Sequence, residues 1–208
     1  MIKAHISPIF PTPIYTSKLD RKFTKQELRF VEKMKTEWVQ NVENRYSSNR
    51  HVLNHPSFAT LKKEMDLFIK DYFSKILSPP KTVFPYITQS WLNYTETNES
   101  HHAHRHPNSY LSAVFYINAD KAHDKITFEH GRYDQIKIPT TEWNLFNSSS
   151  WFFPVESGDI VMFPSRLTHL VPKKEGKNTR ISLSFNVFIK GNLGQPASLY
   201  GLSELNIN

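Results

Sequence analysis

The sequence predicts an α+β fold in which two helices support one sheet of a β-sandwich. Two observations predict it. Residues 20–80 carry apolar side chains at helical spacing, whereas the chain from Thr82 onward is rich in β-branched and aromatic residues separated by turns. Helices followed by strands are typical of α+β folds. The 208 residues suit one domain, 1–208, with a helical buttress at about 20–80 and a strand-rich core at about 82–190.

The first helix is predicted from Lys25 to Asn44. Thr24 and Glu27 match a capping box, in which each side chain accepts a hydrogen bond from the other residue's backbone N–H. A second helix is predicted from Pro56 to the Pro79–Pro80 pair, which ends it. Its apolar face contains Phe58, Leu61, Met65, Phe68, Ile69, Tyr72 and Ile76. We expect both helices to pack against the core rather than to carry chemistry.

Five strands are predicted in the second half of the chain, and one short edge strand near its start. The five are Val83–Tyr94, Tyr110–Asn118, Lys125–His130, Asp159–Phe163 and Arg180–Ile189, and the edge strand lies near Ile14–Ser17. A loop with four aromatic residues, Trp143, Phe146, Trp151 and Phe152, is expected between Asp134 and Phe153. These aromatic side chains either line the mouth of a cavity or pack on the outside of the sheet.

Composition excludes several kinds of site. The chain has no cysteine, so it has no disulfide, zinc–thiolate site or thiol nucleophile. Its net charge of +7 would favour a polyanionic partner, but no nucleic-acid motif accompanies this charge. No apolar run approaches the length of a membrane span, and the first residues lack a secretion signal. We expect a cytoplasmic protein, in the host cytoplasm if a phage encodes it.

Four histidines fall within six residues, at positions His101, His102, His104 and His106. Alternate residues of a strand share a face, so His104 and His106 could point into one cavity, as could His102 and His104. Imidazole is a common ligand for iron, copper, nickel and zinc. The alternative is an exposed histidine-rich loop, as in an affinity tag.

A second polar region follows the strand that ends at Pro164. It contains His169 and then Arg180, which opens a strand whose residues Arg180, Ser182, Ser184 and Asn186 share one face. A guanidinium group and hydroxyl groups on one face can bind a carboxylate through charge-assisted hydrogen bonds. The alternative is a polar strand face directed to solvent.

These pieces follow the order His-x-His, a spacer of 62 residues, His, then Arg-x-Ser. In this order the sequence resembles the 2-oxoglutarate/Fe(II) oxygenase superfamily, and most of all a group of small phage and bacterial members. The resemblance covers nearly the whole chain. It rests on Ser90–Asn93, His104–Ser112, Phe115–Ile117, Gly158–Ser165 with His169, and Arg180–Ser182, and the start of the chain at Phe10–Pro13 agrees with it.

The resemblance implies a double-stranded β-helix (jelly-roll) core and a dioxygenase, most simply a hydroxylase. It implies Fe(II) as cofactor and 2-oxoglutarate as cosubstrate, with ascorbate as a further candidate. The metal ligands that it implies are His104, His106 and His169. The far carboxylate of 2-oxoglutarate would be bound by Arg180, and Ser182, Tyr116 and Asn93 would complete that site.

One departure from the family concerns the metal ligands. Most members use two histidines and a carboxylate that lies two residues after the first histidine. Here the residue two after His104 is His106, and the residue two after His106 is Asn108, so neither is a carboxylate. Either three histidines bind the iron, or a carboxylate such as Glu99 or Glu129 completes the set, or the site is degraded. Three neutral ligands would leave the iron more positive than the usual set does.

Three other functions compete with an oxygenase. The first is a non-catalytic jelly-roll module that binds a metal or another ligand. The second is a cupin-like dioxygenase that does not use 2-oxoglutarate, although the Arg180-x-Ser182 pattern argues against it. The third is a nucleic-acid binder, which only the charge supports. The sequence indicates neither the substrate, which could be a small molecule, a protein side chain or a nucleobase, nor the oligomeric state.

Overall fold

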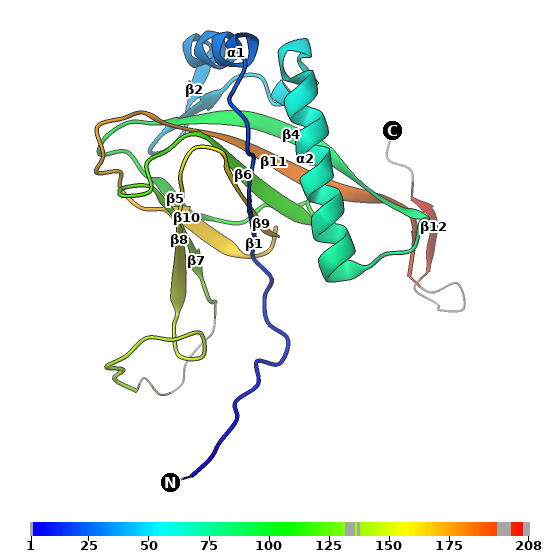
Figure 1. Cartoon of the computed structure of the whole chain (residues 1–208), viewed down its shortest axis with the longest axis vertical. Helices are drawn as coiled ribbons and strands as arrows, with labels where there is room; N and C mark the ends of the chain where they lie inside the picture. Colours follow the sequence, from blue (N-terminus) through cyan, green and yellow to red (C-terminus); the bar gives the residue numbers. More distant parts are fainter. Residues whose placement is uncertain (1, 132–135, 137, 195–200, 206–208) are drawn as a thin grey trace.

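The strands form two antiparallel sheets that face each other in a jelly roll (Figure 1). The computed structural model describes residues 2–131, 136, 138–194 and 201–205. In order across the larger sheet lie β1 (Tyr15–Lys18), β9 (Asp159–Pro164), β6 (Leu111–Asn118), β11 (Arg180–Leu193), β4 (Val83–Thr95), β3 (Arg45–Ser47) and β2 (Trp38–Gln40), and β12 (Leu202–Leu205) also pairs with β11. The smaller sheet has the order β5 (His101–His104), β10 (Thr168–Val171), β7 (Lys125–Glu129) and β8 (Ser150–Pro154).

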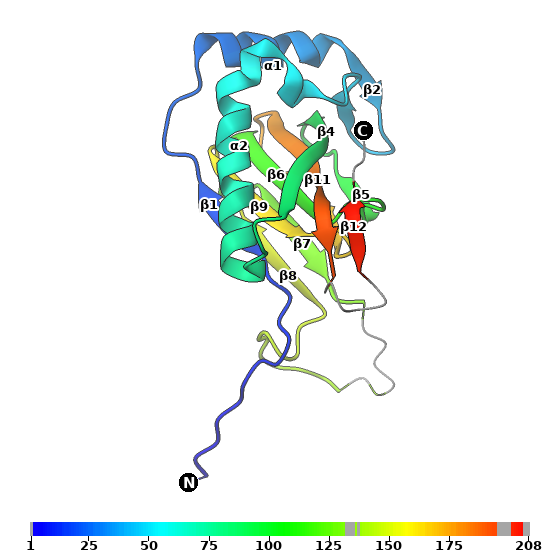
Figure 2. The same cartoon turned by 90° about the vertical axis from the view of Figure 1, so that its right-hand side faces the viewer.

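Two helices, α1 (Lys25–Thr36) and α2 (Ala59–Tyr72), cover the outer face of the larger sheet, as Figure 2 shows. The predicted α+β jelly roll with two buttressing helices is thus confirmed. Three short helical segments flank α2: η1 (Val52–Asn54), η2 (Pro56–Phe58) and η3 (Phe73–Leu77). None of the helices in the described ranges is long and apolar enough to span a bilayer.

Strand alternation divides the larger sheet into a face that packs on the helices and a face that packs on the smaller sheet. On β6, Phe115 belongs to the helix-side core, whereas Tyr116 packs with Phe128 and Phe163 between the two sheets. The same alternation on β11 places Leu183 and its odd-numbered neighbours against the helices. Its even-numbered residues are therefore left to line the interior between the sheets.

The first helix is shorter than predicted. The capping box is confirmed, since Glu27 N donates to Thr24 Oγ1 over 3.1 Å and Thr24 N donates to Glu27 Oε2 over 2.7 Å. The helix ends at Thr36, however, and not at Asn44. The Thr36 hydroxyl bonds the carbonyl of Lys33 (2.7 Å), and residues 38–47 form the β2–β3 hairpin, which extends the larger sheet beside β4.

The second helix and the five strands of the second half are confirmed, with small changes. The chain leaves regular α-helix at Phe73, so Ile76 is 38% exposed instead of lying on the apolar face. The edge strand is β1, which pairs with β9. The expected loop from Asp134 to Phe153 is wrong at its end, because Ser150–Pro154 pair with β7 as β8. Residues 132–135 and 137 of that loop lie outside the described residues.

Candidate metal centre

Three histidines meet where β5, an edge strand of the smaller sheet, pairs with β10. His104 ends β5 and lies directly opposite His169 of β10, and His106 follows two residues after His104. The ring centroids of His104 and His169 are 4.2 Å apart, and those of His106 and His169 are 5.1 Å apart. The potential ligand nitrogens of the three residues lie within 4.8 Å of one another. We call His104, His106 and His169 the triad.

Each imidazole of the triad is oriented by a hydrogen bond at Nδ1. His104 Nδ1 lies 2.8 Å from the carbonyl oxygen of His102, and His169 Nδ1 lies 3.1 Å from that of Leu167. A carbonyl oxygen can only accept, so Nδ1 carries the proton in both rings and Nε2 keeps its lone pair. His106 Nδ1 is 2.6 Å from the side-chain oxygen of Asn186, which fixes the same tautomer.

The Nε2 atoms of His104 and His106 lie 3.1 Å apart. Two lone pairs at that distance repel each other unless a proton or a cation lies between them. Burial, followed by the neighbouring His104, lowers the pKa of His169 to about 2. Burial also lowers the pKa values of His104 and His106. All three imidazoles are therefore neutral at physiological pH, which is the form that binds a metal.

The two carboxylates named as alternative ligands lie elsewhere. Glu99 accepts a hydrogen bond from the backbone of Glu96 (2.7 Å) and from Arg45 (3.4 Å). Glu129 lines a different cavity. Among the described residues, the groups able to hold a metal are the triad and the set His101, His102 and His104. The structure therefore gathers imidazoles here, without either of these carboxylates.

His101 contributes a side chain that the sequence did not assign to the site. Its ring stacks on His104 with centroids 4.4 Å apart, and Asn41 Nδ2 lies 3.3 Å from its Nε2. Burial lowers the pKa of His101 to about 3. His101 was visible in the histidine cluster, but strand parity placed it on the opposite face from His104 and His102.

The polar face of β11 lines the same interior space as the triad. We call this space the inner cavity; its walls include Asn44, Trp91, Asn93, Thr95, His101, His104, His106, Tyr116, His169, Arg180, Ser182 and Ser184. Asn93 Nδ2 donates to Ser184 Oγ over 2.9 Å, and Arg180 Nη2 donates to Thr95 Oγ1 over 3.0 Å. Arg180 is only 4% exposed, so the alternative of a solvent-facing strand is wrong. Arg180, Ser182, Tyr116 and Asn93 thus share one cavity with the triad.

The inner cavity adjoins a buried group of charges with a net positive charge. Asp124 Oδ1 lies 3.6 Å from Arg180 Nη1 and 4.0 Å from Lys174 Nζ. The Lys174 ammonium also donates to the carbonyl of Gly176 (2.8 Å) and to Asn178 (2.9 Å). Two cations and one anion leave one positive charge uncompensated in this group. Buried charge is costly unless it is paired, so the group favours an anion.

Two hydrogen-bond donors that line the inner cavity have no partner among the residues that the structure describes. They are the Tyr116 hydroxyl and Asn44 Nδ2, both on buried side chains. Asn44 Oδ1 accepts a hydrogen bond from Asn41 over 2.9 Å, and this bond fixes the amide. Unsatisfied buried donors are uncommon and indicate a missing acceptor. Nothing in the sequence around Asn44 marked it as a site residue.

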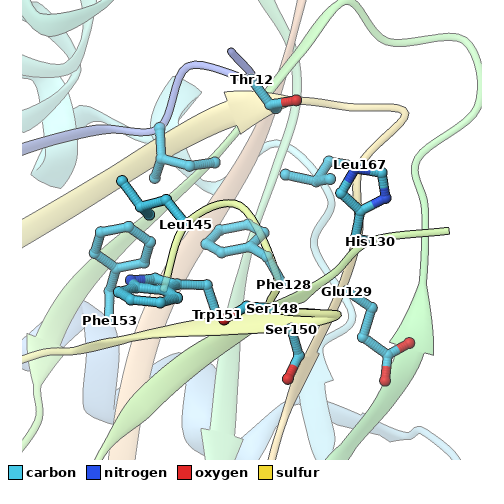
Figure 3. A pocket seen from close by; sticks show the side chains of 11 residues that line it. Thr12, Phe128, Glu129, His130, Leu145, Ser148, Ser150, Trp151, Phe153 and Leu167 are labelled. Atoms are coloured by element: carbon cyan, nitrogen blue, oxygen red, sulfur yellow. The ribbon is translucent and has the colours of Figure 1, made fainter. Parts of the chain in front are cut away.

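A second cavity lies beside the first, between β7, β8 and the N-terminal segment (Figure 3). We call it the aromatic cavity; it is lined by Thr12, Ile14, Phe128, Glu129, His130, Leu145, Ser148, Ser150, Trp151, Phe153 and Leu167. Of the aromatic residues predicted at a cavity mouth, Trp151 lines it. Trp143, Phe146 and Phe152 are exposed and are not among its lining residues.

Comparison with known proteins agrees with this description. Residues 89–186 match a protein family described as "Putative 2OG-Fe(II) oxygenase". This range contains the triad, Arg180, Ser182, Tyr116 and Asn93. Among curated proteins, none matches the chain by sequence.

Several solved structures share the fold at low sequence identity. The epimerase SnoN from nogalamycin biosynthesis, described as non-haem and α-ketoglutarate-dependent, has a TM-score of 0.64 at 13% identity, covering 93% of this chain and 89% of its own. HygX from Streptomyces hygroscopicus, solved with nickel, 2-oxoglutarate and hygromycin B, has a TM-score of 0.58 at 12% identity, covering 85% and 82%. An oxidoreductase of the 2OG-Fe(II) oxygenase family from Burkholderia pseudomallei has a TM-score of 0.54 at 14% identity, covering 83% of each chain. None of these three descriptions names a phage, so the expected phage origin is unsupported.

Proposed function

Because the core of this chain belongs to the 2OG-Fe(II) oxygenase family, a family of oxidoreductases, we propose that the protein hydroxylates a substrate with Fe(II) and 2-oxoglutarate. One observation carries the proposal. A triad of neutral imidazoles with free Nε2 lone pairs opens on the same cavity as a buried arginine with hydroxyl and amide partners. A module that only bound metal would have no need for a carboxylate site beside it.

The triad has the chemistry that an iron site requires. His104, His106 and His169 would hold Fe(II) through Nε2, because their Nδ1 atoms are already engaged. With 2-oxoglutarate, bound Fe(II) would supply the oxidation of a substrate C–H bond to C–OH by dioxygen, releasing succinate and carbon dioxide. Three protein ligands leave positions for the cosubstrate and dioxygen.

The far end of the inner cavity suits a dicarboxylate. Arg180 would bind the far carboxylate of 2-oxoglutarate, and the uncompensated positive charge near Asp124 and Lys174 would favour it. The free donors of Tyr116 and Asn44 would find acceptors, and Ser182 and Asn93 stand beside them. The free space in the inner cavity is about 30 Å³, enough for about two water molecules, so 2-oxoglutarate would have to displace lining side chains.

The proposal is tested by anaerobic titration of the protein with Fe(II) and 2-oxoglutarate. We expect the visible charge-transfer band of the iron–cosubstrate chelate, and its loss in His169→Ala. Under air, with ascorbate added as reductant, the protein should release succinate, since many such enzymes turn over 2-oxoglutarate slowly without substrate. Failure to bind both Fe(II) and 2-oxoglutarate would overturn the proposal.

The second candidate is a non-catalytic module that binds metal and 2-oxoglutarate. The all-imidazole triad favours it, because the carboxylate that most family members use is missing. The module predicts the charge-transfer band without succinate release, even after a panel of small molecules, peptides and nucleosides has been screened. Succinate release that depends on His169 would exclude it.

A further inference from the structure

We propose that the aromatic cavity binds a flat, uncharged ring system carrying a hydroxyl group at its edge, and that this ring is part of the substrate. The assignment of this ligand as the substrate rests on the proposed function. Binding in the cavity does not depend on it. The cavity has no lining residue in common with the inner cavity, and of its residues only Glu129, the carboxylate found away from the triad, had been an alternative metal ligand.

The walls of the aromatic cavity favour rings. Figure 3 shows Trp151 and Phe153 beside Leu145, with the ring of Phe128 between this group and Leu167. Phe128 and Phe153 meet edge to face with centroids 5.9 Å apart. Aromatic side chains gain additional energy from stacked and edge-to-face contacts with another ring, beyond the area that is buried.

The polar groups of the aromatic cavity stand at its rim. Glu129 and Ser150 point away from the apolar walls, and His130 lies beside Leu167 (Figure 3). Such a rim can exchange hydrogen bonds with a hydroxyl group, whereas the Glu129 carboxylate disfavours an anionic ligand. The cavity volume of about 340 Å³ falls within the range of small-molecule sites.

Exposed apolar side chains at this cavity provide a driving force for binding. Trp151 is 40% exposed and Leu145 is 77% exposed, although both border the cavity. A bound ring would remove part of this apolar surface from water, which is favourable in proportion to the area buried. A ring system therefore suits the cavity better than a polar ligand does.

The aromatic cavity is connected to the triad by two residues. Leu167 lines the cavity with its side chain, while its carbonyl oxygen accepts the hydrogen bond from His169 Nδ1. Phe128 pairs with His169 across β7 and β10, with ring centroids 6.4 Å apart. A molecule bound in the aromatic cavity would thus be separated from the triad only by the side chain of Leu167 or Phe128. A substituent of this molecule that extended past Leu167 would approach a metal held by the triad.

The test uses 2-naphthol as the probe and the full chain labelled with 5-fluorotryptophan. The chain has four tryptophans, so the ¹⁹F spectrum should show four resonances, assigned by single Trp→Phe variants. We expect 2-naphthol to shift the Trp151 resonance saturably. The Trp91 ring lies tilted beside that of His106, with centroids 5.8 Å apart, and its resonance should respond to Zn(II) with 2-oxoglutarate instead. The two claims thus have separate reporters in one sample.

A matched pair of variants on β8, Phe153→Ala and Phe152→Ala, distinguishes binding in the aromatic cavity from nonspecific hydrophobic binding. Phe153→Ala should weaken 2-naphthol binding about tenfold, and Leu145→Ala, at an exposed position, about threefold. Phe152→Ala should leave it unchanged within twofold, because Phe152 is 53% exposed and does not line the cavity. If Phe153→Ala fails to fold, the comparison of 2-naphthol affinity between Leu145→Ala and Phe152→Ala tests the inference instead.

Three outcomes would overturn the inference. The first is the absence of a saturable shift at Trp151. The second is equal binding of 1-octanol, an open-chain alcohol of similar hydrophobicity. The third is a stable dimer in which Trp151 is already buried, because the cavity would then belong to a contact between two copies. Loss of the Trp91 response with an intact Trp151 response would contradict the proposed function and leave ring binding in place.

Discussion

The guanidinium of Arg180 lies 3.6 Å from the carboxylate of Asp124, and both side chains are at most 5% exposed. Lys174 is the third member of this buried group. Asp124→Asn would leave two buried cations without an anion, so we expect a loss of about 3–5 kcal/mol in the free energy of unfolding. Urea denaturation measures it. The double variant Asp124→Asn/Lys174→Met should recover part of the loss, and equal stability of Asp124→Asn and the native protein would contradict the pairing.

Replacement of Arg180 should weaken cosubstrate binding. Arg180→Ala removes the charge-assisted hydrogen bonds proposed for the 2-oxoglutarate carboxylate, so affinity should fall by about 2–4 kcal/mol. Anaerobic calorimetry with the Fe(II)-loaded protein gives this value. Arg180→Lys keeps the charge without the planar fork and should lie between the two. An unchanged affinity in Arg180→Ala would remove Arg180 from the proposed site.

Asn186 should control metal affinity without being a ligand. Its side-chain oxygen accepts from His106 Nδ1 over 2.6 Å and so holds Nε2 toward the other two imidazoles. Loss of such a partner typically lowers metal affinity 10–100-fold, and we expect about this effect for Asn186→Leu. Asn186→Asp keeps the acceptor and should retain binding. Competition with a chromophoric chelator measures both variants, and equal affinities for the two would show that the acceptor does not matter.

The stability of the protein should depend on pH through Glu27. Burial by itself would raise the pKa of Glu27, but hydrogen bonds from Arg21 and Thr24 outweigh it and hold that pKa below its usual value. A carboxyl group whose pKa is lower in the folded state stabilises the fold above its unfolded pKa, and this contribution is lost as pH falls through the folded pKa.

Comparison of the native protein with Glu27→Gln isolates that contribution. At pH 7 the variant should be less stable by about 2 kcal/mol, because it loses charge-assisted bonds to Arg21. The difference should shrink as the pH is lowered below about 4. Chemical denaturation at a series of pH values checks this, and a difference that grows toward acid pH would have the wrong sign.

The sequence predicted the strands more accurately than the ends of the helices. Strands such as β6 and β11 alternate between two buried faces, and this alternation is local. The end of α1 is different, because Trp38 and Val42 continue a helical spacing although both are exposed in or beside the hairpin. β8 was missed because Trp151, Phe152 and Phe153 are three consecutive aromatic residues, which show no alternation.

The site residues that the sequence analysis missed are those brought to the site by contacts between segments far apart in the chain. His104 and Arg180 were found because their strands, spacing and family resemblance pointed to them. Asp124 and Lys174 lie in segments between strands, where charged residues normally indicate solvent exposure, and both are nevertheless buried. Asn44 contacts the inner cavity only because the β2–β3 hairpin joins the sheet beside β4, which the overlong helix prediction hid.

The alternation along β11 has a consequence for how this protein can vary. Arg180, Ser182, Ser184 and Asn186 are directed to the interior, while Ile181, Leu183 and Phe185 pack under the helices. Substitutions on the first set can therefore alter ligand preference while leaving the helix-side packing intact. The deletion of a single residue between Arg180 and Asn186 would reverse the facing of the strand residues on one side of the deletion, turning polar side chains into the apolar layer and apolar side chains toward the inner cavity. This stretch should accordingly tolerate many exchanges of residue type but no change in length.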